Sequence, residues 1–253
     1  MNNKDSVKKT FSTNKEAYIS SSTHAKESDL TLITDWLNPS LQMVALDIAT
    51  GGGHVAKQLS SFVSIVVATD LTEEMLENTA KHLQDYKNIT YKIADAENLP
   101  FMDDIFDIVT CRIAAHHFPN PDRYIYEVAR VLKSKGKFLF IDNIAPTYSV
   151  HDQFINTLEK IRDNSHNRSR TILEWKNILT SSNLSILKEL TRKKRLPYQE
   201  WLERTVEDKN DQEKVNQYIL AAPQDIREYF QFDIDDTTIH SFSIDEWMVM
   251  CEK

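Results

Sequence analysis

The chain has 253 residues, of which 41% are hydrophobic and 27% are charged, as in an ordinary globular protein that can bury a substantial core. Its formal net charge of −8 argues against a dedicated binder of nucleic acid or anionic membranes. We expect a cytoplasmic protein for three reasons. The chain has two cysteines, it shows no apolar signal core, and it has no apolar run near the ~20 residues of a membrane span.

The first elements lead to a glycine turn. Helical spacing of apolar residues predicts a helix over 26–37, and the apolar run 43–48 predicts a buried strand. Three of the chain's four glycines, Gly51 to Gly53, follow this strand and precede a helical segment that starts near Val55. Glycine permits positive φ and lets backbone amides approach a ligand, so the turn favours a nucleotide-type ligand over a plain tight connection.

Strands and helices then alternate. Strands are expected at 62–70, 89–94, 105–111 and 137–141, and helices at 72–83 and from Pro121 to about Leu132, with Asn120 as N-cap and Gly136 as the stop. This alternation predicts an α/β fold with a doubly wound, Rossmann-like sheet of mostly parallel strands. Ligands bind such sheets at the carboxyl ends of the strands.

The second half has a different pattern. Residues 146–235 read as a helical cap with one core strand at 184–190, a capping box at Thr171 and Glu174, and a helical stretch over 198–230. The basic run 192–195 is expected to be a solvated strand end. Residues 239–251 predict a strand or strand pair that rejoins the sheet. We therefore divide the chain into an N-terminal lid and helix (1–38), a ligand-binding core (39–145), a helical cap (146–235) and terminal strands (236–253).

Two ligands compete for the crevice at the carboxyl ends. Gly51-x-Gly53-x-x-Ala56 fits the dinucleotide pattern, and Asp70 lies 70 − 51 = 19 residues later, where a ribose-binding acid belongs in an NAD-dependent oxidoreductase. Asp47, however, places a negative charge where a pyrophosphate would sit. S-adenosylmethionine carries a sulfonium and an ammonium, which this carboxylate would stabilise. Asp70 would then accept the ribose hydroxyls, and Asp95 with Ala96 would face adenine, unless these acids are only caps or turn residues.

The core resembles the class I S-adenosylmethionine-dependent methyltransferases, in particular the ubiquinone/menaquinone-biosynthesis-like group with the methyltransferase-11 domain. The resemblance covers about residues 40–145 and rests on six segments in the family's order: 46–53, 70–76, 95–101, 106–112, 116–118 and 130–133. It implies a seven-stranded sheet whose last strand is antiparallel, and S-adenosyl-L-methionine as cofactor. The family has glycine where this chain has Ala49. The candidate cofactor-binding residues are Asp47, Ala49, Thr50, Gly51, Gly53, Asp70, Leu71, Asp95, Ala96 and Arg112.

The acceptor is not fixed by the resemblance. The segment 110–115, at the end of the fourth expected strand, lacks the Asp/Asn-Pro-Pro-aromatic signature typical of amino-group methylation. We therefore expect a small-molecule acceptor and no nucleic acid. His116 and His117 are candidate catalytic residues because an imidazole can take a proton near neutrality, although one can simply pack on the cofactor. No metal is expected. A non-catalytic S-adenosylmethionine-binding protein stays open as an alternative.

The N-terminus is a candidate lid. Residues 1–25 are polar except for Phe11 and Tyr18 and lead directly into the helix before the glycine strand. A site that transfers a methyl group has to exclude water, so we predict that this segment folds over the cofactor and forms one wall of the acceptor pocket. A solvated tail without a role is the alternative.

Overall fold

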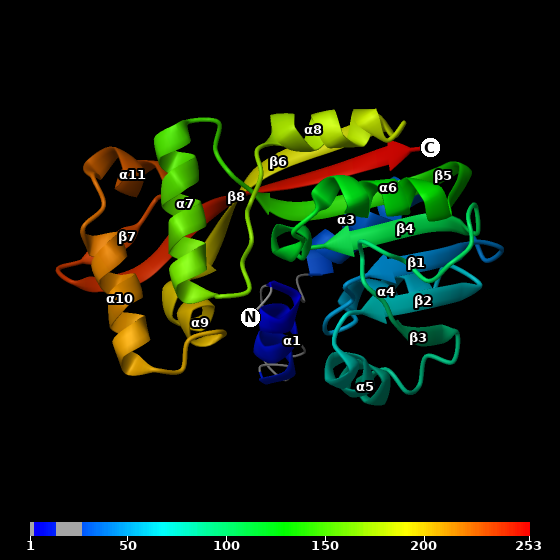
Figure 1. Ribbon diagram of the computed structural model, residues 1–253, viewed down its shortest axis with the longest axis horizontal. Helices are drawn as coiled ribbons and strands as arrows, with labels where there is room; N and C mark the ends of the chain where they lie inside the picture. The colour runs from blue at the N-terminus through cyan, green and yellow to red at the C-terminus, as the bar shows by residue number, and fades with distance from the viewer. Residues whose placement is uncertain (1–2, 14–26) are drawn as a thin grey trace.

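A single mixed sheet organises the fold (Figure 1). The computed structural model describes residues 3–13 and 27–253. The strands follow the order β3-β2-β1-β4-β5-β8-β6, and β7 pairs with β8 off this path. Neighbours from β3 to β5 are parallel, whereas β8 runs antiparallel to both β5 and β6. The strands are β1 (Val44–Ile48), β2 (Ile65–Asp70), β3 (Ile89–Ile93), β4 (Phe106–Arg112), β5 (Leu132–Ile144), β6 (Ser185–Pro197), β7 (Asp233–Asp235) and β8 (Thr238–Glu252).

Helices cover both faces of the sheet, and a group of them lies at one end (Figure 1). Among the described residues none is long and apolar enough to cross a membrane. They are α1 (Asn3–Thr13), α3 (Glu27–Leu37), α4 (His54–Ser60), α5 (Glu73–His82), the short 3-10 helix η1 (Ala115–His117), α6 (Pro121–Val131), α7 (Ser149–Arg162), α8 (Ile172–Ser181), α9 (Tyr198–Glu203), α10 (Lys209–Leu220) and α11 (Gln224–Tyr229).

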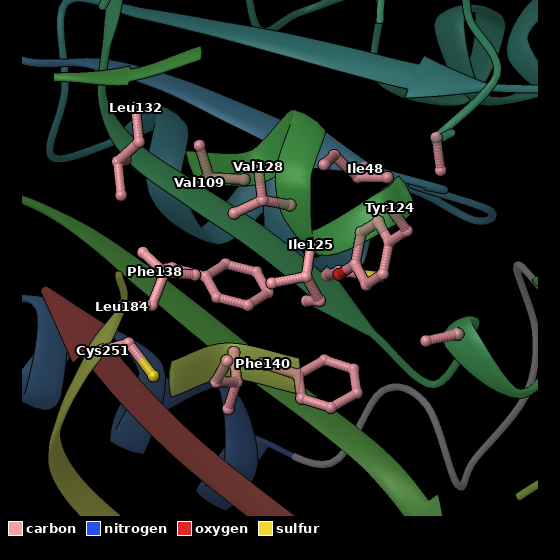
Figure 2. Packing of buried hydrophobic residues seen from close by; sticks show 14 of the residues in the cluster. Ile48, Val109, Tyr124, Ile125, Val128, Leu132, Phe138, Phe140, Leu184 and Cys251 are labelled. Atoms are coloured by element: carbon pink, nitrogen blue, oxygen red, sulfur yellow. The ribbon is translucent and has the colours of Figure 1, made fainter. Parts of the chain in front are cut away.

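Alternating side chains of the central strands supply two cores. Phe138 and Phe140 of β5 pack with α6 and α8 on one face, while Leu139 and Ile141 pack with α3 and α4 on the other. Figure 2 shows the first cluster, with Ile125 of α6 beside the two phenylalanines. Because successive strand residues point to opposite faces, one apolar run serves both layers. This explains why the central strands read as continuous hydrophobic segments.

A third core lies beyond the central sheet. The strands β6 and β8 stay paired beyond the end of β5, and Leu196, Phe242 and Ile244 in this extension pack with α7, α9, α10 and α11. The aromatic pairs in this cluster include Phe232 stacked on Phe242 at 5.2 Å between ring centroids. The cap helices are therefore built on the extended strand pair, seen at the left of Figure 1.

The structure corrects several sequence predictions. The sheet has an eighth strand, β7, in addition to the seven expected, because the segment before β8 folds back as a short hairpin. Gly136 does not stop α6, which ends at Val131, since Leu132 already pairs with Phe106 in the sheet. The stretch 198–230 forms three helices with breaks between them. Asn120 is the N-cap residue, but its side chain donates to Glu97 and makes no capping bond.

The basic run 192–195 lies near the end of β6 and is only partly solvated, because Lys193 and Arg195 are exposed whereas Lys194 is not. Lys194 is buried and its Nζ lies 2.9 Å from Oε2 of Glu246, which is also buried and pairs with Arg192. The two cations lower the pKa of Glu246 below its ordinary value although burial opposes this. The acids of the adjacent antiparallel strand β8 therefore neutralise this part of the run, an outcome that depends on strand pairing.

Candidate functional site

One pocket lies at the carboxyl ends of β1, β2 and β4, and it holds nearly all the predicted ligand-binding residues. It contains about 1020 Å³ of space, open solvent at its mouth included. Of the predicted set only Gly53 is absent from its wall, where Gly52 stands instead. The predicted residues that line it are Asp47, Ala49, Thr50, Gly51, Asp70, Leu71, Asp95, Ala96 and Arg112.

Asp47 is a buried acid at the base of this pocket. Thr50 Oγ1 donates to its Oδ2 over 2.6 Å, and Thr110 Oγ1 donates to its Oδ1 over 2.7 Å. Burial raises the pKa of Asp47 to about 6, even though both hydroxyls and the charge of Arg112 act in the opposite direction. A carboxylate that is this poorly solvated gains by pairing with a cation. The base of the pocket therefore suits a positively charged ligand group better than a phosphate.

The turn after β1 uses left-handed backbone three times. Ala49, Gly51 and Gly53 have φ values of 52°, 50° and 76°. A Cβ added at Gly53 would lie 2.6 Å from Thr79 Cγ2, whereas one at Gly51 would meet nothing within 4 Å. Gly53 is thus needed for packing against α5, and Gly51 leaves open space on the pocket side for a ligand to approach the backbone. Ala49 adopts the left-handed conformation although its Cβ makes that conformation less favourable than it is for glycine.

Asp70 and Asp95 lie at the ends of neighbouring strands. Asp70 Oδ2 accepts from the amide of Gly51 over 3.2 Å, and its Oδ1 accepts from the amide of Thr72 over 3.1 Å. Burial raises the pKa of Asp70 above its ordinary value, although these bonds oppose it. Each carboxylate oxygen can accept a second hydrogen bond. Asp70 therefore joins the glycine turn to the start of α5 and keeps acceptor capacity for a ligand.

The helix α1 covers one side of the pocket. Lys4 and Val7 line it, and Lys4 Nζ lies 2.6 Å from Asp95 Oδ2 and 2.7 Å from Glu97 Oε2. Ser12 also donates to Glu74 of α5 over 3.1 Å. The described part of the predicted lid thus contacts the ligand pocket. The remainder of that prediction, over 14–25 and including Tyr18, lies outside the described residues.

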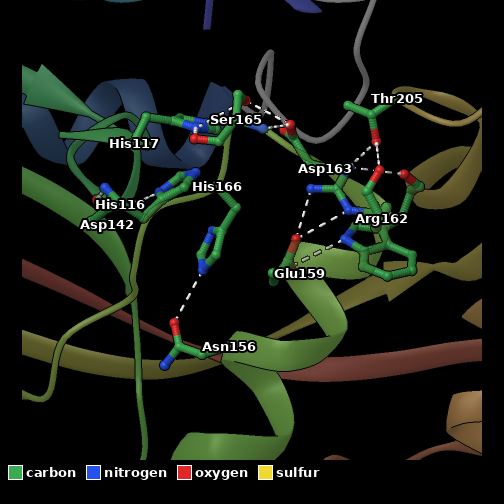
Figure 3. A network of polar contacts seen from close by, with 11 residues as sticks. His116, His117, Asp142, Asn156, Glu159, Arg162, Asp163, Ser165, His166 and Thr205 are labelled. Atoms are coloured by element: carbon green, nitrogen blue, oxygen red, sulfur yellow. Dashed lines mark hydrogen bonds and ion pairs between the residues drawn. The ribbon is translucent and has the colours of Figure 1, made fainter. Parts of the chain in front are cut away.

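The two adjacent histidines are in different positions. His117 lines the pocket, whereas His116 is not part of its wall. Figure 3 shows His116 beside Asp142 and His117 beside Ser165. His116 Nδ1 lies 2.7 Å from Asp142 Oδ1, and its backbone amide donates to Oδ2 of the same carboxylate over 2.9 Å. Burial lowers the pKa of His116, but Asp142 outweighs burial and leaves it above the ordinary value of 6.5.

Sequence reasoning missed several residues of the site. Lys4, His54 and Phe118 line the pocket, and Ser165 contacts His117 from the loop between α7 and α8. His54 directly follows the three glycines, so its place beside the pocket could have been predicted from the sequence. Lys4 and Ser165 are far from the family segments in sequence, and only the folded chain brings them to the pocket.

Comparisons with known proteins agree with this geometry. The family described as "Methyltransferase domain" matches residues 46–140. The Bacillus subtilis (strain 168) protein named "uncharacterized methyltransferase YcgJ" is 35% identical over 224 residues, which cover 87% of this chain and 88% of its own. The crystal structure of B. subtilis YcgJ has a TM-score of 0.86 and 31% identity, covering 89% of this chain and 98% of its own.

Two further matches are weaker, one in coverage and the other in sequence identity. The ubiquinone/menaquinone biosynthesis C-methyltransferase UbiE of Blochmanniella pennsylvanica (strain BPEN) is 36% identical over 113 residues, 42% of this chain and 44% of its own. Phosphoethanolamine N-methyltransferase 2 of Haemonchus contortus, solved with S-adenosyl-L-methionine, shares the fold with a TM-score of 0.65 at 17% identity, covering 100% of this chain and 60% of its own. The relatives favour S-adenosylmethionine over NAD, the alternative that the glycine spacing left open. The chain therefore belongs to the methyltransferase-domain family and is a class I S-adenosylmethionine-dependent methyltransferase.

Proposed function

We propose that this enzyme transfers the methyl group of S-adenosylmethionine to a small-molecule acceptor that enters the pocket beside His117. The observation that carries the proposal is the pocket itself, where a buried acid at the base, the open face of Gly51 and further acids on neighbouring strands lie together. The bound cofactor supplies an electrophilic methyl group on a sulfonium. A cytoplasmic location stays a prediction.

Each acid has a distinct proposed role. Asp47 pairs with the ammonium of the methionine part, because an unsolvated carboxylate is stabilised by a neighbouring cation. Asp70 accepts from the ribose hydroxyls with the lone pairs that its two backbone bonds leave available. Asp95 receives the adenine amino group, for which Lys4 must share or release Asp95 Oδ2. Arg112, also in the wall, faces the carboxylate of the methionine part.

The remaining contribution of the protein is alignment and exclusion of water. The acceptor has to approach the methyl carbon in line with the carbon–sulfur bond, and holding both partners in that geometry supplies much of the rate acceleration. The helix α1 covers the pocket from one side, with Val7 as an apolar part of its wall. The partly closed shape suits a small molecule, because a macromolecular segment would need an open groove.

Calorimetric titration and an acceptor screen test the proposal together. We expect S-adenosylhomocysteine to bind and NADH not to bind, and at least one member of a broad panel of small acceptors to be methylated. Binding of NADH alone would contradict the cofactor assignment. Binding of S-adenosylhomocysteine without turnover of any acceptor would instead support the non-catalytic alternative.

A further inference from the structure

We propose that Thr79 of α5 is a positioning residue for the cofactor. Its hydroxyl fixes the orientation of the peptide between Gly51 and Gly52, and thereby turns the Gly52 amide toward an acceptor oxygen of the bound ligand. This inference rests on the proposed cofactor site and deepens it. Thr79 itself is not part of the pocket wall, so it acts through the glycine turn.

Thr79 contacts two glycines of the turn at once. It is completely buried, and its Oγ1 donates to the carbonyl oxygen of Gly51 over 2.5 Å. Its Cγ2 fills the space beside Gly53, where an added Cβ would lie only 2.6 Å away. A threonine inside a helix can bond a carbonyl one turn earlier in the same helix, but this hydroxyl bonds a residue 28 positions away. The contact therefore joins α5 to the turn after β1.

The peptide between Gly51 and Gly52 has a defined direction. A trans peptide is planar, so its N–H points opposite to its C=O, and the described residues contain no cis peptide. Because the Gly51 carbonyl points to Thr79, the Gly52 N–H points away from α5. Gly52 is buried in the pocket wall, and none of the described residues accepts a hydrogen bond from its amide. A buried amide needs an acceptor, which a ligand in the pocket can supply.

The sequence makes this peptide easy to turn over. Glycine flanks it on both sides, so rotation of its plane meets no Cβ. After such a rotation the carbonyl oxygen would face the pocket and repel an acceptor oxygen of the ligand. The bond from the Gly51 amide to Asp70 Oδ2 fixes only the preceding peptide. Among the described side chains, Thr79 is the one that holds the Gly51 carbonyl.

Removing the hydroxyl should therefore weaken binding. In Thr79→Val, which keeps the branched shape of the side chain, the Gly51 carbonyl would be buried without a donor. This disfavours the binding orientation by about 10-fold, and apparent affinity falls with the fraction of competent molecules. We expect the dissociation constant for S-adenosylhomocysteine to rise about 10-fold in Thr79→Val, to rise also in Thr79→Ala, and to stay within about 2-fold in Thr79→Ser, which keeps the hydroxyl.

The orientation can be measured without a ligand. Glycine follows glycine only at positions 52 and 53 of the chain, so protein labelled with ¹³C-carbonyl and ¹⁵N in glycine alone gives one HNCO signal for each of these amides. The signal that joins the Gly51 carbonyl to the Gly52 amide should move or split in Thr79→Val and stay in place in Thr79→Ser. An identical signal in wild type and Thr79→Val would overturn the proposal.

Calorimetric titration with two ligands identifies the acceptor oxygen. Compared with S-adenosylhomocysteine, 5′-methylthioadenosine keeps the ribose and adenine but lacks the amino-acid part. Weaker binding of both to Thr79→Val would place the acceptor on the ribose, and weaker binding of S-adenosylhomocysteine alone would place it on the carboxylate. An unchanged dissociation constant for S-adenosylhomocysteine would overturn the proposal, even in a less stable variant, because a purely structural threonine affects stability alone.

Ser60→Ala is the matched control. Ser60 of α4 is buried, its hydroxyl donates to the carbonyl of Lys57 over 2.7 Å, and it is not part of the pocket wall. Its loss should leave both glycine signals and the dissociation constant unchanged. Equal weakening of binding in Ser60→Ala and Thr79→Val, or in Thr79→Ser and Thr79→Val, would overturn the proposal. Failure of the wild type to bind S-adenosylhomocysteine would instead remove the proposed function, and the wild-type titration alone reveals that case.

Discussion

Replacing Asp47 by asparagine should stabilise the cofactor-free protein while weakening cofactor binding. Burial raises the pKa of Asp47 from 3.8 to about 6, so the folded state favours the protonated carboxyl. Above pH 6 the buried carboxylate therefore opposes folding, and below pH 4 this penalty disappears. At 1.36 kcal/mol for each pH unit, the difference corresponds to about 3 kcal/mol, as an order of magnitude. Asparagine is neutral, and Thr50 and Thr110 can still bond its amide.

The assay is urea unfolding of both proteins from pH 4 to pH 7.5 without cofactor, read as the free energy of unfolding. The Asp47→Asn variant should be more stable by up to about 3 kcal/mol at pH 7.5, and the advantage should shrink toward pH 4. In parallel, calorimetry should show that wild-type affinity for S-adenosylhomocysteine falls as pH drops through about 6, because the acid then gains a proton. The variant should bind weakly, without that dependence.

Asp163 provides a control of opposite sign. It is also buried, but nearby positive charge and the two bonds from Ser165 outweigh burial and hold its pKa below the ordinary value. Its carboxylate therefore contributes stability above the unfolded-state pKa, which is lost as pH falls through the folded pKa. Asp163→Asn should be less stable than wild type at pH 7.5. If both variants were destabilised alike, the reasoning about Asp47 would be refuted.

Three further predictions follow from the pocket. Asp70→Ala should weaken S-adenosylhomocysteine binding by about 2–4 kcal/mol, and should also cost about 1–2 kcal/mol of stability because two backbone amides lose their acceptor; an unchanged dissociation constant would remove Asp70 from the site. Ala49→Gly should raise the free energy of unfolding in urea by about 0.5–1 kcal/mol, because glycine relieves the left-handed conformation; a decrease would show that the alanine methyl group makes stabilising contacts. Amides of α1 should exchange more slowly with deuterium when S-adenosylhomocysteine is bound, and faster in Lys4→Ala but not in Lys8→Ala; equal exchange in all states would exclude a lid.

The sequence alone predicted the parts of the protein that depend on local pattern. The apolar run before Gly51 predicted the central strand, and the alternation of strands and helices predicted a parallel sheet. Parallel strands place their carboxyl ends at one edge, so Asp70, Asp95 and Arg112 were expected in one crevice, and all three line the same pocket. The capping box at Thr171 also formed as predicted, because both of its partners lie within one turn.

Predictions from local sequence pattern were wrong where strand pairing determines the structure. Gly136 was expected to end α6, but the helix stops at Val131 because Leu132 joins the parallel ladder with β4. Lys194 was expected in solvent, but it is buried against Glu246 because β8 pairs with β6. In both cases the residue's own neighbours in sequence contain no information about the strand that lies beside it.

Only the tertiary structure decided which distant segments lie beside His117 and Asp95. Ser165 contacts His117 across 48 residues of sequence, and Lys4 contacts Asp95 across 91. Such contacts depend on where the loop after α7 and the helix α1 lie in the folded chain. The spacing of apolar residues in the sequence does not predict these positions. The sequence located most residues of the candidate cofactor pocket because they follow strand ends of one repeating βα pattern. Lys4 and Ser165 come from segments without a repeating pattern, and the positions of these segments are set by long-range packing.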